Sequence, residues 1–350
     1  MNKPVCPPTR LFLEGLVPPS TSHVARDTLP LAMTQQRRVP VAATLVAVAV
    51  STLTIGVGAF GEAGHRIVGT LAELHLANTR ALTEVRRILR PNETLADAAV
   101  WPDRIKNPLY EDGETAAFRL NHPAQDTYHY ANLPFQSGRY SLDLPGARPT
   151  DVVEMAAEAI RVLRTGKGLF TPREALRLLA HFVGDIHQPL HVGNGFVSAS
   201  GPLQFVVPQG PAGWRTTLGG NALVYGPENR FNLHSYWDSH AVNITMQQAD
   251  VRGFASQLLT SVKPLPEWTM KGEVDTWPAQ WASEGLEHAK TVHRGIRLVS
   301  YLGPDDAKQT PHRWLIEQPA GYDDVARPLI RQQLAAGGFR LAAVLRAIWP

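Results

Sequence analysis

HFVGDIHQPLH, residues 181–191, closes a long apolar stretch and holds three histidines and one carboxylate. A Thr-Pro-x-Glu start at 171–174 and the break at Pro189 predict that a helix spans this stretch and ends at Gln188. His181 and Asp185 are four residues apart, which places an imidazole and a carboxylate on one face of that helix. A carboxylate buried there without a partner would be costly, so a metal site is harder to dismiss here than at an exposed pair.

The same spacing recurs in NLHSYWDS, residues 232–239, where a histidine and an aspartate are again four apart. One such pair is usually a surface ion pair, and two raise the suspicion of a metal site only modestly. Further imidazoles and carboxylates lie in the motifs GEAGH, WPDRIK and YHY and just beyond Pro189. Imidazole and carboxylate without thiolate is the ligand set of a catalytic zinc cluster rather than of a zinc finger. The candidate ligands are His65, Asp103, His129, His181, Asp185, His191, His234 and Asp238.

The composition is that of a folded globular protein and limits where a phosphate-binding charge can come from. Of 350 residues, 44% are hydrophobic, 8% aromatic and 19% charged, which excludes disordered and collagen-like chains. The net charge of +3 arises entirely within residues 1–59, so the remainder is balanced and offers no broad basic surface for nucleic acid. The only cysteine, Cys6, rules out an intramolecular disulfide and a cysteine-based zinc site.

The N-terminal region has the features of an export signal. Arg37-Arg38 precedes an uncharged run over 39–59 that ends in Val57-Gly58-Ala59, a basic, apolar and small-x-small order typical of a cleaved signal peptide. An uncleaved membrane anchor is the alternative, because the run is nearly long enough to span a bilayer. We expect residues 1–32 to be an over-extended start or a leader, 33–59 the signal peptide, and 60–350 the functional domain.

Cleavage after Ala59 would create a new N-terminus at Phe60. A free α-amine and the carbonyl next to it can together chelate a metal ion, whereas a peptide nitrogen cannot.

The remaining periodicity predicts one mainly α domain without βαβ alternation or internal repeats. A Gly- and Pro-rich segment over 193–220 reads as a short β-hairpin or loop insertion. The predicted helical segments are 65–90, 95–106, 152–165, 171–188, 232–262, 278–301 and 324–348.

These motifs, in this order and spacing, resemble the zinc-dependent single-strand-specific nuclease and 3′-nucleotidase family. The resemblance is carried by GEAGHRIVG, WPDRIK, YHYANLP, HFVGDIHQPLHVG, GGN and NLHSYWDS, and it is strong over about 60–240 and loose beyond. It implies a mostly helical fold with three zinc ions at the bottom of a cleft, a fold that related zinc phospholipases C share.

The resemblance also implies how the ligands are divided among the metals. Asp185 bridges the first zinc and the second, and the third zinc lies apart from that pair. The implied sets are Asp103, His129, His181 and Asp185 for the first zinc; His65, Asp185 and the amine and carbonyl of Phe60 for the second; and His191, His234 and Asp238 for the third.

The implied reaction is hydrolysis of single-stranded RNA and DNA to 5′-phosphate products and of 3′-nucleotides. A water whose pKa is lowered by the close zinc pair attacks phosphorus, with Asp185 as the central catalytic ligand. Lys106 would stabilise the pentacovalent oxygens, while Tyr130 would stack on a splayed base and Asn132 would contact the substrate. His187 would orient a ligand from outside the metal shell.

This sequence departs from the family at three places. Phe60 stands where a tryptophan is usual, although only main-chain atoms would bind metal there. Asn132 occupies a position where many eukaryotic members have aspartate, which puts a charge at that position in doubt. The 193–220 insertion is longer than usual and lacks the aspartate that ordinarily precedes GGN.

Two other functions remain open at this point. A zinc-dependent phospholipase C would need a choline-accommodating pocket and apolar membrane-facing loops, and the GGN and YHY contexts favour the nuclease instead. A zinc-binding relative without catalysis would keep the ligands and lose activity. For the nuclease we expect a periplasmic or secreted monomer with no stable membrane association after signal cleavage.

Overall fold

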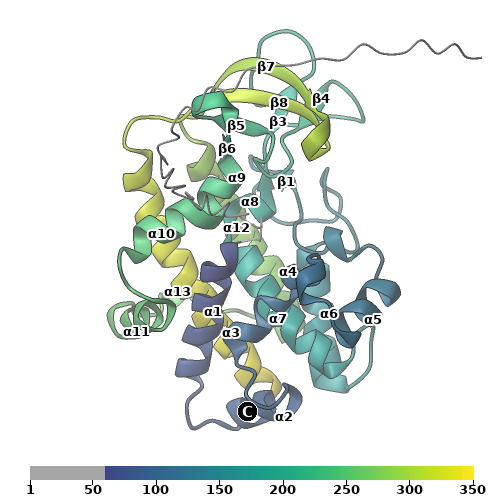
Figure 1. Ribbon diagram of the computed structural model, residues 1–350, viewed down its shortest axis with the longest axis vertical. Coiled ribbons are helices and arrows are strands. Elements are labelled where there is room, and N and C mark those ends of the chain that lie inside the picture. Colours follow the sequence, from purple (N-terminus) through teal and green to yellow (C-terminus); the bar gives the residue numbers. More distant parts are fainter. Residues whose placement is uncertain (1–59) are drawn as a thin grey trace, which may run out of the picture. The chain divides into compact units, whose positions relative to one another are not determined.

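The computed structural model describes residues 60–350, so the expected leader and signal peptide lie outside the described residues. Helices dominate, which confirms the prediction of a mainly α fold (Figure 1). The longer helices are α1 (Gly61–His75), α2 (Arg80–Ile88), α5 (Gly113–Asn121), α6 (Val152–Thr165), α7 (Pro172–His187), α10 (Ala241–Met246), α11 (Val251–Ser261), α12 (Trp277–His293) and α13 (Tyr322–Ile348). The short ones are α3 (Leu95–Ala98), α4 (Trp101–Arg104), α8 (Pro189–Val192), α9 (Leu233–Ser235) and a π-helical turn over Tyr236–His240.

Helix α7 is buried along almost its whole length. Its N-terminus is closed by a capping box in which Glu174 N–H donates to Thr171 Oγ1 at 3.3 Å and Glu174 Oε2 accepts from Thr171 N–H at 2.7 Å. Every residue from Ala175 to His187 is buried. Because α7 has no solvent-exposed side in that region, its polar side chains face other parts of the protein rather than water.

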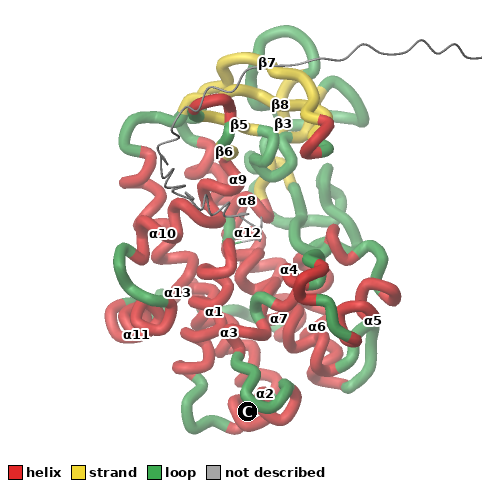
Figure 2. The backbone as a smooth tube through the Cα atoms, in the orientation of Figure 1, coloured by secondary structure: helices red, strands yellow, loops and turns green. Residues whose placement is uncertain are grey.

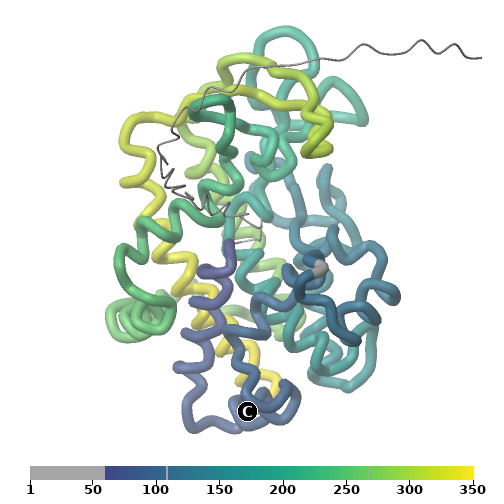
Figure 3. Tube along the Cα trace, viewed as in Figure 1, coloured from purple at the N-terminus to yellow at the C-terminus, as the bar shows by residue number. Residues whose placement is uncertain are grey.

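Helices α1 and α13, from opposite ends of the described chain, lie side by side (Figures 1 and 3). A Cβ added at Gly338 of α13 would lie 2.6 Å from the side chain of Leu71 in α1, so only glycine permits this close approach. The contact fixes α1, and with it His65, against the rest of the helices.

Strands gather beyond one end of the helices, as Figure 2 shows in yellow. The largest sheet has the order β6-β5-β8-β7, in which β5 and β8 are parallel and the other neighbours antiparallel. The strands are β1 (Leu133–Pro134), β2 (Gly193–Asn194), β3 (Phe196–Ser198), β4 (Trp214–Thr216), β5 (Leu223–Tyr225), β6 (Phe231–Asn232), β7 (Arg297–Asp305) and β8 (Thr310–Glu317). Antiparallel β3 and β4 form the short hairpin expected in the 193–220 insertion.

Four of the predicted helical segments differ from the structure. The segment predicted over 95–106 is divided into α3 and α4. The segment predicted over 278–301 is helical only to His293, because Gly295 turns the chain at φ +77° and residues from Arg297 pair with β8 instead. The segment predicted over 65–90 is two helices separated at 76–79, where Asn78 has φ +61°. The segment predicted over 232–262 is divided into α9, the π-helical turn, α10 and α11.

Candidate metal centre

Three groups of imidazoles and carboxylates converge in the interior. Within each group, one donor atom from each side chain lies within 4.8 Å of the others. The groups are His65, His181 and Asp185; Asp103, His129 and His181; and His191, His234 and Asp238. All eight side chains that the sequence suggested as ligands are therefore in these groups.

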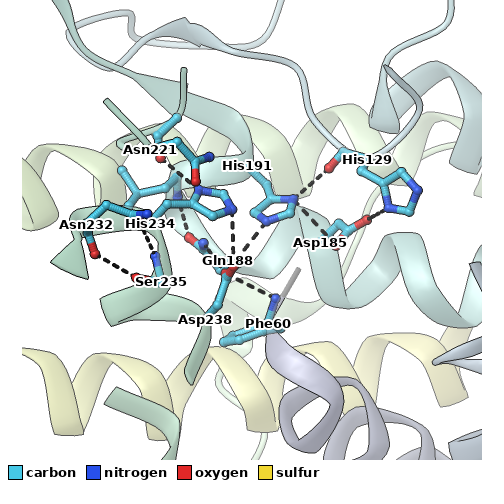
Figure 4. A network of polar contacts seen from close by, with 12 residues as sticks. Phe60, His129, Asp185, Gln188, His191, Asn221, Asn232, His234, Ser235 and Asp238 are labelled. Atoms are coloured by element: carbon cyan, nitrogen blue, oxygen red, sulfur yellow. Dashed lines mark hydrogen bonds and ion pairs between the residues drawn. The ribbon is translucent and has the colours of Figure 1, made fainter. Parts of the chain in front are cut away.

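Asp185 stands between the first two groups, and its two oxygens face different imidazoles. Oδ2 lies 3.1 Å from His181 Nε2 and 3.3 Å from His129 Nδ1. Oδ1 lies 3.4 Å from His65 Nε2 and 3.5 Å from His191 Nδ1, the latter visible in Figure 4. A carboxylate in this position can give one oxygen to each of two neighbouring cations.

Backbone carbonyls fix the orientation of three of these imidazoles. In each, Nδ1 lies at hydrogen-bond distance from a carbonyl oxygen, so Nδ1–H donates a hydrogen bond to it. Nε2 is then the ring nitrogen whose lone pair can bind a metal. The pairs are His181 with Ala99 at 2.6 Å, His191 with His129 at 2.6 Å, and His234 with Gly219 at 2.8 Å.

Several buried polar atoms in the three groups make no hydrogen bond with any described residue. They are both ring nitrogens of His65, both carboxylate oxygens of Asp185, Asp103 Oδ1, His191 Nε2 and Asp238 Oδ2. Buried polar groups left unsatisfied are costly, and bound cations would satisfy them together. The donor set of imidazole and carboxylate, without thiolate, fits zinc.

The pKa values of the candidate ligands are shifted in both directions. Burial raises the pKa of Asp185, but the nearby imidazolium charges of His181 and His191 outweigh it and hold the pKa well below its ordinary value. Burial, followed by the charge of His181, lowers the pKa of His65. Burial, followed by the charge of Lys106, lowers the pKa of His129 to about 4. Asp185 is therefore ionised and the rings of His65 and His129 are neutral at pH 7, as ligands must be. For His191, burial lowers the pKa, but the charges of Asp185 and Asp238 outweigh it and raise the pKa to about 9, so a bound metal would displace a proton from that ring.

Phe60 reaches the centre with its main chain. It is fully buried, and its N–H donates to Asp238 Oδ1 at 3.2 Å (Figure 4). Phe60 and Gly61 both have positive φ, +47° and +52°, and a Cβ at Gly61 would lie 2.7 Å from the Asp238 carbonyl oxygen. This tight turn brings the nitrogen beside Asp238, a ligand expected for the third metal. The Phe60 carbonyl accepts from Gly64 N–H at 3.1 Å and keeps one lone pair free.

Gln188 is a contributor that the sequence did not single out. It is fully buried, and its Nε2 donates to Asp238 Oδ1 at 2.7 Å. His187 does not have the orienting role expected of it: Nδ1 lies 2.6 Å from the Val183 carbonyl and Nε2 lies 3.0 Å from Arg340. Both ring nitrogens are thus engaged away from the candidate ligands, and the neighbouring amide holds a ligand instead.

A pocket of about 500 Å³ opens beside the three groups. Lys106, Tyr130 and Asn132, the three residues expected to meet substrate, all line it. Lys106 Nζ lies 3.7 Å from Asp103 Oδ1, and the Arg148 guanidinium lies 4.9 Å from the centre of the Tyr130 ring. The other lining residues are Asp126, His129, Leu190, His191, Leu218, Gly219, Asn221, Asn232, His234, Lys308, Gln309 and Thr310.

A helical protein with these buried donor groups beside an open pocket belongs to the class of metal-dependent hydrolases. Residues 60–350 match the model of the S1/P1 nuclease family over their whole length, and the chain belongs to that family. The prediction of a single-strand-specific endonuclease, a hydrolase of phosphodiester bonds that acts on nucleic acid and depends on metal, is thereby confirmed. The phospholipase alternative is not supported.

Known relatives agree with this assignment. Endonuclease 2 of Arabidopsis thaliana is 24% identical over 83% of this chain and 90% of its own length. Endonuclease 3 of the same plant is 26% identical over 85% of this chain and 91% of its own length. Nuclease S1 of Aspergillus oryzae is 24% identical over 89% of this chain and 98% of its own length.

Within residues 60–350, none of the helices has the length and apolar character needed to cross a membrane.

Proposed function

We propose that residues 60–350 are the mature enzyme and hold three zinc ions with the ligands that the family resemblance implies. Asp185 would contribute to both of the first two sites, and His191, His234 and Asp238 would hold the third ion. The observation that carries this proposal is the set of buried imidazole and carboxylate atoms without hydrogen bonds, gathered around Asp185.

Zinc would supply a lowered pKa for water and stabilisation of negative charge on phosphate. The protein residues position the substrate around that centre. Lys106, on the pocket wall 3.7 Å from Asp103, stabilises the negative charge that builds up on the phosphate oxygens. Gln188 keeps Asp238 in place through its 2.7 Å hydrogen bond, so that this carboxylate remains directed at the centre.

Single-strand preference follows from what the pocket can accept. Tyr130 stacks on one base, and Asn132 offers an amide to that base or its sugar. A paired base would first have to leave its stack, which costs free energy, whereas a base in a single strand is already available.

The same centre acts on 3′-nucleotides. Cleavage of the bond between phosphorus and the 3′-oxygen gives 5′-phosphate ends from a polynucleotide and releases phosphate from a 3′-nucleotide. One bond type therefore accounts for both activities. We further propose export to the periplasm or medium through the 33–59 signal, release from the membrane on cleavage, and a monomeric enzyme.

Denatured DNA and RNA should be cut at least about ten-fold faster than duplex of the same sequence, because duplex bases must be unstacked first. A chelator should abolish cleavage, and added zinc should restore it. End-group analysis should find 5′-phosphates, and adenosine 3′-phosphate should release phosphate while the 5′-isomer does not. Products with 3′-phosphates would refute the proposed cleavage between phosphorus and the 3′-oxygen. A protein that binds its full zinc content but has no activity would instead be a catalytically inactive relative of the family.

A further inference from the structure

An arginine and two aromatic rings form a cluster outside the pocket. The Arg215 guanidinium lies 5.1 Å from the centre of the Tyr301 ring, over its face. The Tyr301 hydroxyl lies 2.8 Å from His312 Nδ1. Burial and the charge of Arg215 lower the pKa of His312, so the ring is neutral, and its Nδ1 shares one hydrogen bond with the Tyr301 hydroxyl. Tyr301 is thereby held in place although it remains 44% exposed.

Arg215, like Arg148 and Arg331, lies over an aromatic ring and forms no ion pair with a carboxylate among the described residues. Two other arginines over rings differ in this respect. Arg104 and Arg177 also lie over rings, those of Tyr110 and Trp101, but each is paired with a glutamate. Among residues 60–350, no carboxylate forms an ion pair with Arg215. Its positive charge is therefore not neutralised within the described part of the chain, and its side chain is only half-buried.

The cluster adjoins the pocket along two strands. Arg215 lies in β4, three residues before Leu218, and His312 lies in β8, two residues after Thr310; Leu218 and Thr310 both line the pocket. At no more than about 3.6 Å per residue, these Cα atoms are within about 11 Å of the pocket lining.

The four-stranded sheet places Tyr301 and His312 relative to the metal centre. Strand β8 pairs with β5, and β5 pairs with β6, which leads directly into His234. Tyr301 and His312 are thus connected to the third donor group by one sheet, whereas Arg215 lies in β4, which pairs with β3 in a separate two-stranded sheet.

We propose that Arg215 binds the phosphate of a nucleotide next to the one in the pocket, and that Tyr301 positions the Arg215 guanidinium. Arginine suits this contact because its planar guanidinium can donate two hydrogen bonds to one phosphate. The subsite would extend the contacts with a single strand beyond the cleaved bond. The inference rests on the proposed metal position beside the pocket.

The test compares a dinucleotide without a terminal phosphate (a dinucleoside monophosphate), whose only phosphate is the cleaved one, with a single strand of about ten nucleotides. In Arg215→Ala, kcat/KM for the longer strand should fall about three-fold to ten-fold more than for the dinucleotide. The slope of log kcat/KM against log salt for the longer strand should become shallower by about 0.7, the value for one lost phosphate contact in a single strand. Arg215→Lys should keep the slope because it keeps the charge.

Tyr301→Ala should raise KM for the longer strand without changing kcat for the dinucleotide, and Tyr301→Phe should restore KM by keeping the ring under Arg215. Tyr110→Ala is the matched control, because Tyr110 is 48% exposed and lies under Arg104, an arginine already paired with Glu62. In Tyr110→Ala, KM for the longer strand and kcat for the dinucleotide should both equal those of the unmodified protein.

Equal losses on both substrates in Arg215→Ala, or an unchanged salt slope, would overturn the subsite while leaving the proposed metal centre intact. Failure of the unmodified protein to hydrolyse the dinucleotide with zinc would instead overturn the metal assignment, and the subsite with it.

Discussion

The Asp185→Asn variant is expected to lose at least about 100-fold in kcat/KM and to retain less zinc than the unmodified protein. Asp185 is fully buried, and its two oxygens face His65 and His191 on one side and His129 and His181 on the other. An amide has one oxygen and no charge, so it cannot serve two cations at once. Activity on single-stranded DNA and zinc per chain by elemental analysis are the measurements.

Asp151→Asn provides the matched control for this variant. Asp151 is also a fully buried carboxylate, but it caps the N-terminus of α6, where its Oδ1 accepts from Val153 N–H at 2.9 Å. Asparagine caps helices about as well as aspartate, so folding, zinc content and activity should all be retained. If Asp185→Asn keeps more than about a tenth of the activity in a folded protein, Asp185 is not a bridging ligand.

A protein that retains one extra residue before Phe60 is expected to bind one zinc ion fewer and to lose about ten-fold or more in rate. The Phe60 nitrogen is buried 3.2 Å from Asp238 Oδ1, inside the donor cluster. When a residue precedes it, that nitrogen belongs to a peptide bond and has no lone pair to give a metal. As a free amine, with an ordinary pKa near 8, it can lose its proton to bind zinc.

The comparison uses Met-Phe60 and Phe60 starts of the same chain, with both N-termini established by mass spectrometry. Trimming the extra methionine with an aminopeptidase should restore zinc content and rate, which separates the chemistry of the amine from a folding defect. Equal zinc content and equal activity in the two forms would remove the α-amine from the ligand set.

The helical part of the fold could be predicted because its signals are local. Helices α6 and α7 begin at capping residues that identify a helix start within four residues of sequence. The β7–β8 hairpin gives no such signal. Register shifts between Leu298 and Ser300 and between Tyr301 and Gly303 interrupt its alternation of buried and exposed residues. Because that alternation is missing, the sequence pattern predicts that the helix continues beyond His293.

The donor residues of the centre could be predicted because their spacing and motifs lie in short segments. Gln188 could not, since a single glutamine carries no pattern, and only its hydrogen bond to Asp238 identifies it. Arg215 and Tyr301 could not either, because they lie far apart in the chain, in strands of two different sheets, and only the folded structure brings them together. A contact between side chains of distant strands leaves no trace within a short stretch of sequence.

Zinc per chain is the most direct test of the trinuclear centre. It should be measured by elemental analysis, with native mass spectrometry of the same sample, on protein that begins at Phe60 and was purified without chelator. Three groups of buried donors predict three zinc ions in each molecule. A value of one zinc ion, or of none, in folded protein would contradict the account.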